Sequence, residues 1–317
     1  MDPIGGYFSL ELPRLEEYHK DALGLNTGRN GLEYILIARG YRKVYLPFYV
    51  CEVILEPLRK LGVRYEFYHV DGRLEIKDPL SPDLDEAILY VNYFGLKQRY
   101  VESLAGKYGS RLIIDNTQAF YAKPVAGIDT FYSCRKFFGV PDGAYLYTEK
   151  HLDFSLEQDE SYGRMGHLVK RIDLGAECGY EDFRLNDDRL SNQPIRLMSR
   201  LTRRLMQSVA YDSAARQRRR NYLRLNTALG SSNKMDLSLE EDAVPMVYPY
   251  LSDVPELREK LIADKVFVAS YWSNVLGWTR HGDTEYVLAS RMLPLPIDQR
   301  YSERDLDRVV KLVQSCN

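Results

Sequence analysis

The residue types best suited to chemistry lie close together near the middle of the chain. Asp115 ends the apolar run LIID, Gln118 follows three residues later, and Ser133 precedes the basic residues Arg135 and Lys136. A lysine amine that loses its proton can attack a carbonyl and form a Schiff base. Hydroxyl and guanidinium groups can bind phosphate, and a carboxylate can bind a protonated ring nitrogen. This segment therefore combines a nucleophile, an acid and anion-binding groups.

Chemistry with pyridoxal 5′-phosphate (PLP) needs all of these functions, together with phosphate-binding donors that are commonly at a helix N-terminus. Lys136 would form the Schiff base, and Asp115 would bind the pyridine nitrogen. Ser133 and Arg135 would contact the phosphate, and Gln118 would lie near the ring hydroxyl. The sequence therefore predicts a PLP site.

Ordinary structural interpretations exist for the same residues. Asp115 could cap a turn, because aspartate is common at strand ends. Lys136 could be a surface lysine, but it precedes the apolar segment FFGVPDG, so we expect this region to be buried. Trp272 is expected in the core or at an interface rather than as a platform for substrate.

The elements around these residues alternate between helix and strand at short spacing from residue 25 to residue 115. This alternation is typical of a mostly parallel sheet with helices on both faces. Ligands of such sheets bind beyond the carboxyl ends of the strands. Pro47, Asn92 and Asp115 fall at those ends, which is where we expect the site.

The rest of the chain is expected to be less regular. An arm and a short helix should precede the sheet, and a long interrupted helix should end near Gly230. A small α+β unit should follow, with strands at AVPMVYPYL and VFVASYW. The predicted domains are an N-terminal arm (1–24), a large cofactor-binding domain (25–215), and a linking helix with a small C-terminal domain (216–317).

Composition argues against several classes of partner. The 43 basic and 45 acidic residues give a net charge of −2, so no nucleic-acid partner is expected, and the arginines at 216–220 are interpreted as a solvated helix face. The sequence shows neither an apolar run long enough to span a bilayer nor a secretory signal, so we expect a cytoplasmic protein without a membrane partner. The four cysteines lack metal-type spacing, and no metal is expected.

The order of these motifs resembles the type I PLP-dependent enzymes, and in overall layout the DegT/DnrJ/StrS sugar aminotransferases. The segments LPFYVCEVILEPLRKLGVRYEFYHVD, YVNYFG, LNTGRNGLEYIL and VPMVYPYL each resemble a family segment, while SCRKFFG is closest in form to the cysteine-desulfurase-like branch. The resemblance implies the type I PLP-transferase fold with a small C-terminal α+β domain. It also implies a homodimer, because the sites of this fold lie between subunits.

The resemblance further implies roles for residues outside the central segment. Thr27, Gly28 and Arg29 would offer backbone amides to the phosphate. Tyr49 or Cys51 would occupy the ring-stacking position, and Asn92 would line the site. The chain departs from the family in one clear respect, because Phe131 stands where the family usually has a serine, five residues before the lysine.

The function that the resemblance implies is an aminotransferase. Its small-molecule substrates would be an amino donor such as glutamate and a keto-sugar nucleotide or related carbonyl compound, in surface-polysaccharide or secondary metabolism. Two alternatives remain open. One is a PLP-dependent lyase, dehydratase or desulfurase, the last with Cys178 as its nucleophile. The other is a non-catalytic relative with the same fold.

Overall fold

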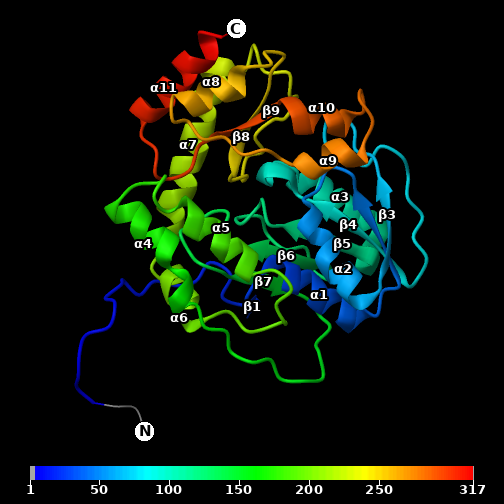
Figure 1. The fold of residues 1–317 in the computed structure, drawn as a ribbon. Helices are drawn as coiled ribbons and strands as arrows, with labels where there is room; N and C mark the ends of the chain where they lie inside the picture. The colour runs from blue at the N-terminus through cyan, green and yellow to red at the C-terminus, as the bar shows by residue number, and fades with distance from the viewer. Residues whose placement is uncertain (1–3, 317) are drawn as a thin grey trace.

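The computed structural model describes residues 4–316, so the first three residues of the predicted arm lie outside the described residues. A seven-stranded sheet forms its centre, with the strand order β1-β7-β6-β5-β4-β2-β3 (Figure 1). All neighbouring strands pair in parallel except at β7, which is antiparallel to both β6 and β1. The strands are β1 (Leu23–Leu25), β2 (Lys43–Pro47), β3 (Arg64–Tyr68), β4 (Glu86–Val91), β5 (Leu112–Asn116), β6 (Asp129–Ser133) and β7 (Ala144–Tyr147).

The register of the central strands brings the ends of three of them together. Every residue of β4 and β5 is buried, which explains why these strands are almost continuously apolar rather than alternating. Val91 of β4 pairs with Asp115 of β5, and Asp115 pairs with Phe131 of β6. Asp115 therefore reaches the carboxyl edge of the sheet between two apolar neighbours, as the sequence pattern predicts.

Helix α1 (Gly28–Arg39) packs against β6 and β7 and begins at the same edge of the sheet. The Thr27 side chain caps the helix by accepting a hydrogen bond from the Asn30 backbone N–H at 3.2 Å. A Cβ at Gly31 would lie only 3.1 Å from the Phe131 Cβ, so glycine allows the helix to lie close to the sheet. Two further helices of this half are α2 (Leu55–Leu61) and α3 (Gln98–Tyr108), with short 3-10 turns η1 (Glu52–Ile54), η2 (Tyr93–Gly95) and η3 (Gly109–Arg111).

The second half of the chain is mainly helical and includes the antiparallel pair β8 (Val247–Leu251) and β9 (Met292–Pro296). Figure 1 shows the long helix α7 running from the sheet towards the C-terminal unit. The predicted interrupted helix is confirmed, because α6 and α7 are separate. The helical elements are η4 (Tyr162–Arg164), α4 (Gly166–Asp173), α5 (Tyr180–Arg189), α6 (Arg200–Met206), α7 (Tyr211–Leu229), α8 (Leu257–Ala263), α9 (Ser273–Trp278), α10 (Thr284–Arg291) and α11 (Glu303–Gln314).

Two predicted elements are wrong. The segment before β1 contains no helix from residue 4 onward, and its buried anchor is His19, which packs among aromatic rings of the sheet. The segment VFVASYW forms no strand. Its carbonyl groups at Val268 and Ala269 instead accept hydrogen bonds from the Arg258 guanidinium, at 3.3 and 2.6 Å. A side chain thus satisfies acceptors that a neighbouring strand would otherwise bind.

Two absences hold for residues 4–316. Within that range no helix is both long and apolar enough to cross a membrane. The same residues contain no group of three or more His, Cys, Asp and Glu side chains that could hold a metal ion.

Candidate active site

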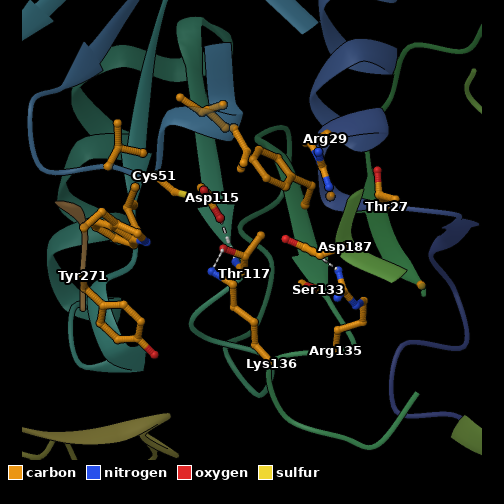
Figure 2. Close-up of a pocket in the computed structure, with 18 of the residues that line it drawn as sticks. Thr27, Arg29, Cys51, Asp115, Thr117, Ser133, Arg135, Lys136, Asp187 and Tyr271 are labelled. Atoms are coloured by element: carbon orange, nitrogen blue, oxygen red, sulfur yellow. Dashed lines mark hydrogen bonds and ion pairs between the residues drawn. The ribbon is translucent and has the colours of Figure 1, made fainter. Parts of the chain in front are cut away.

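A cavity of about 290 Å³ opens at the carboxyl edge of the central strands, and we call it the sheet-end cavity. It lies between the ends of β4, β5 and β6, the start of α1, and a loop of the C-terminal unit (Figure 2). Eight of the residues predicted from the sequence line it. They are Thr27, Gly28, Arg29, Cys51, Asp115, Ser133, Arg135 and Lys136.

Asp115 is a buried carboxylate, 6% exposed, to which no Lys, Arg or His side chain of the described residues donates a hydrogen bond. Its Oδ1 accepts a hydrogen bond from the Thr117 backbone N–H at 2.8 Å. Burial raises the pKa of Asp115, while the charge of Lys136 and the hydrogen bonds from Thr117 oppose that rise. Because no cationic side chain donates a hydrogen bond to it, Asp115 can accept one from a cationic N–H group of a ligand.

Lys136 lies in the turn that follows β6, and its Nζ is 3.5 Å from the Thr117 Oγ1. Asp115, Thr117 and Lys136 follow one another through the middle of the view in Figure 2. The predicted burial of this region is confirmed for Phe137 and Phe138 but is wrong for Lys136, which is exposed. The apolar side chains anchor the turn in the core, and this leaves the lysine at the mouth of the cavity.

The first turn of α1 forms another wall of the cavity. Among the described residues, no acceptor is found for the backbone N–H groups of Gly28 and Arg29, which are the first two residues of the helix. A Cβ on Gly28 would lie 3.3 Å from the Thr117 Cγ2, so this glycine allows the helix end to approach the loop after Asp115. Two unpaired N–H groups at a helix N-terminus favour an anion.

The two arginine side chains of this cavity are already paired. The Arg29 guanidinium lies 2.9 Å from the Glu56 carboxylate and also contacts the Ser191 hydroxyl at 3.1 Å. The Arg135 guanidinium lies 2.9 Å from the carboxylate of Asp187, which belongs to α5 and also lines the cavity. An anion in the cavity would therefore share each arginine with a carboxylate.

Three predicted site residues do not line the sheet-end cavity. Gln118 is fully buried, and its Oε1 accepts a hydrogen bond from the Phe94 N–H at 3.0 Å while its Nε2 has no partner. The Asn92 side chain accepts from the Lys97 N–H at 3.1 Å, so it organises the start of α3. Tyr49 is fully buried, and its hydroxyl has no hydrogen-bond partner. The structure places these three side chains behind the wall of the cavity.

The position expected to hold a ring-stacking side chain is occupied by Cys51, which lines the cavity. Burial raises the pKa of the Cys51 thiol, and the nearby charge of Lys136 opposes this rise. Trp272 also lines the cavity and packs against Tyr49, with ring centroids 5.1 Å apart. The expected packing of Trp272 against the core is thus observed, and the same side chain also forms part of the cavity wall.

The lining residues that sequence reasoning missed include Thr117, Asp187, Tyr271 and Trp272. Thr117 could have been found, because a residue two positions after a strand-end aspartate commonly closes a turn with it. Asp187 is distant from Lys136 in the chain, on helix α5, and no local sequence pattern indicates that the two line one cavity. The same applies to the aromatic pair in the C-terminal unit.

No protein-family model and no curated protein matches this chain. Solved structures do match it. A DegT DnrJ EryC1 StrS aminotransferase from Brucella abortus has a TM-score of 0.61 at 18% identity, over 93% of this chain and 85% of that chain. A GDP-4-keto-6-deoxymannose-3-dehydratase with bound GDP-perosamine has a TM-score of 0.64 at 14% identity, over 92% and 88%.

A third match is NtdA from Bacillus subtilis with bound cofactor PMP, which has a TM-score of 0.61 at 14% identity, over 93% of this chain and 73% of that chain. Identities this low establish a shared architecture and nothing finer. The predicted fold class is thereby confirmed: the chain has the fold of the DegT/DnrJ/EryC1/StrS sugar aminotransferases of known structure.

Proposed function

We propose that this protein is a PLP-dependent aminotransferase that acts on a keto-sugar nucleotide or a related small carbonyl compound. One observation supports this most strongly. The buried Asp115 carboxylate, the Lys136 amine and the free N–H groups at the start of α1 line a single cavity. This set matches the three ends of PLP, which are a basic ring nitrogen, an aldehyde and a phosphate.

The residues present fit the cofactor in chemical type. Asp115 would bind the protonated ring nitrogen. Burial raises the pKa of Asp115, and the positive charge of the ring nitrogen would lower it and so favour the ionised carboxylate. The N–H groups of Gly28 and Arg29, with the Ser133 hydroxyl, would bind the phosphate.

When bound, PLP supplies an aldehyde that bonds to amines and a ring that withdraws electrons from the neighbouring carbon. The chain supplies the acid–base chemistry. The Lys136 amine would bond to the aldehyde and, when displaced by the amino donor, would move a proton on the substrate carbon. The Thr117 hydroxyl, 3.5 Å from Nζ, can orient that amine. Trp272 and Tyr271 would cover the side of the cavity formed by the C-terminal unit and exclude water.

The structural neighbours favour a sugar substrate. One neighbour is a sugar aminotransferase from Micromonospora echinospora, and another was solved with a TDP-sugar product, while the dehydratase shows that the same fold serves a different reaction. A desulfurase has less support. The exposed Cys178 lines neither the sheet-end cavity nor any other cavity described below. The homodimer remains a prediction.

The test is spectroscopic. The purified protein reconstituted with PLP should absorb at about 410–430 nm, and an amino donor such as glutamate should convert that band to one at shorter wavelength. Lys136→Ala should lose the band at about 410–430 nm, whereas Lys150→Ala, which changes an exposed loop lysine, should keep it. A PLP band that no amino donor converts would favour a lyase, a dehydratase or a non-catalytic relative. Failure to bind PLP at all would overturn the proposal.

A further inference from the structure

A second cavity, of about 660 Å³, borders the turn that carries Lys136, and we call it the hairpin cavity. Its walls come from that turn, from the hairpin formed by α4 and α5, from α7, and from the loop after β9. Arg135 and Lys136 line both cavities, so the two lie next to each other across one turn of the chain. Its volume is in the range of cavities that hold small molecules.

The charges in the hairpin cavity do not balance. Of its five Lys and Arg side chains, Arg135 pairs with Asp187 outside the cavity, and Arg300 pairs with Asp298 at 2.7 Å. Asp298 is the one acidic residue in the wall. The other three cations, Lys136, Arg171 and Arg218, form no ion pair with a carboxylate of residues 4–316. The walls of the hairpin cavity therefore carry an excess of positive charge.

Two buried groups add to the polar lining of the hairpin cavity. Arg218 is 1% exposed and donates only to neutral acceptors, among them the Gln299 Oε1 at 2.8 Å and the Met246 carbonyl at 3.0 Å. Burial lowers the pKa of Arg218 to about 10, so its side chain is still charged at neutral pH. His167 is 8% exposed, and its Nδ1 has no hydrogen-bond partner although the residue lines the cavity. A buried nitrogen without a partner, in a wall that also contains a buried charge, indicates a polar ligand.

The outer wall is aromatic. Tyr180 and Phe183 of α5 stack with ring centroids 6.4 Å apart, and both rings are exposed by more than two fifths. Arg135 lies over the Phe183 ring at 5.8 Å from its centroid. Open ring faces beside cations suit a ligand that carries a planar or apolar group next to an anion.

We propose that the hairpin cavity binds an organic phosphate with a planar or apolar group, and that Arg171 contacts the phosphate. Of the three cations without an ion pair, Arg171 lies on α4 and is exposed, so it can contact a ligand directly. Arg218 is buried and contributes its positive charge from within the wall. The proposal rests on the proposed function in one respect. The phosphorylated part of the acceptor would bind in the hairpin cavity. Its carbonyl group would then approach Lys136, which lines both cavities.

The experiment measures binding to the protein without PLP, by calorimetry at low salt. Uridine 5′-diphosphate is the main probe, pyrophosphate tests the charge alone, and uridine tests the ring alone. Arg171→Gln should weaken uridine 5′-diphosphate and pyrophosphate by roughly tenfold. Arg184→Gln is the matched control, since it removes the same charge from an exposed position of α5 outside the cavity, and its affinities should stay within about twofold. Tyr180→Ala should weaken uridine 5′-diphosphate but not pyrophosphate.

Equal affinities in Arg171→Gln and Arg184→Gln would overturn the proposal, and so would the absence of binding by both phosphate probes at about 1 mM. Because PLP is absent from this experiment, its result is separable from the proposed function. Binding that depends on Arg171 in a protein that never forms the PLP band would retain the phosphate site and overturn its assignment to the phosphorylated part of the acceptor. A normal PLP band without phosphate binding would overturn only the proposal that the hairpin cavity binds a phosphate.

Discussion

The two cavities that meet at Lys136 are built in different ways. The sheet-end cavity lies at the ends of strands that include β4 and β5, whose residues are all buried, and its carboxylate, Asp115, lies between paired strand ends. The hairpin cavity is covered by two helices with one buried residue each, His167 and Asn186, and with apolar side chains such as Ile172 in solvent. The difference suggests that a fixed framework holds the chemistry and that a looser cover recognises the substrate.

The largest effect is expected from Asp115→Asn. Loss of the carboxylate should reduce turnover of the PLP-loaded protein by at least roughly 100-fold, because the ring nitrogen would lose its anionic partner. Burial raises the pKa of Asp115, so its ionised form destabilises the unliganded protein at neutral pH. Thermal or urea unfolding without PLP should therefore show the variant to be more stable by about 1 kcal/mol.

Asp129→Asn is the matched control for that stability measurement. Asp129 is also buried, but it accepts two hydrogen bonds from Arg39, at 2.7 and 2.9 Å. Removing its charge should destabilise the protein by about 3 kcal/mol, because a partly buried guanidinium loses its partner. If Asp115→Asn also destabilised the unliganded protein, Asp115 would be a structural acid, and the contrast between catalytic and structural carboxylates would fail.

The next effect concerns acid stability of the sheet framework. The His19 Nε2–H donates to the Phe120 carbonyl at 2.7 Å, and the Nδ1 of the neutral ring accepts from the Tyr147 hydroxyl at 3.1 Å. Burial lowers the pKa of His19 to about 4, whereas in the unfolded chain it is near 6.5. The unfolded chain therefore binds more protons between these values, and up to about 3 kcal/mol of stability should be lost as the pH falls from 6.5 to 4.

Urea unfolding across that pH range checks this expectation. In His19→Gln, the free energy of unfolding should depend less steeply on pH than in the parent protein. His151→Gln, which changes an exposed histidine, should show the same pH dependence as the parent protein. The same slope in His19→Gln and in the parent protein would show that the framework's acid sensitivity arises elsewhere.

Hydrogen exchange can separate the two cavities directly. Backbone amides of α4 and α5 should exchange at least roughly tenfold faster than those of β5 and β6, because few buried contacts hold the hairpin. Uridine 5′-diphosphate should slow exchange in the hairpin and leave the strands unchanged. Equal protection in both regions without ligand would remove the distinction between a fixed framework and a looser cover.

The smallest effect is expected from Asp187→Asn. Asp187 holds the Arg135 side chain from α5, so its neutralisation should free that cation for the phosphate of PLP. The affinity for PLP should rise by roughly threefold, which is the scale of a partly exposed ion pair. Asp188→Asn, on the same helix and without an ion pair among the described residues, should bind PLP like the parent protein.

Most of the framework could be predicted from the sequence because each element has a local signal. The continuous apolar runs before Asn92 and after Arg111 predict buried parallel strands, and Thr27 with Gly40 predicts the two ends of α1. The strand predicted at VFVASYW failed because Arg258 satisfies its carbonyl groups, and no local pattern indicates that contact.

The candidate site, too, could be predicted where a local sequence pattern exists and not where tertiary contacts decide. Asp115 and Lys136 could be placed at one sheet edge because both follow predicted strands. The exposure of Lys136 was missed, since the apolar residues beside it anchor the backbone rather than the lysine itself. Asp187, Arg171 and Trp272 could not be assigned to the cavities from the sequence, because each reaches its cavity through tertiary packing of elements that are distant in the chain.

The central claim is that one lysine, Lys136, holds PLP beside a buried acid. Its most direct test is to load the protein with PLP, reduce it with borohydride and map the modified peptide by mass spectrometry. The account predicts a single pyridoxyl group, on Lys136, and no modified peptide in Lys136→Ala. Modification of another lysine in the parent protein, or the absence of any specific modification, would contradict it.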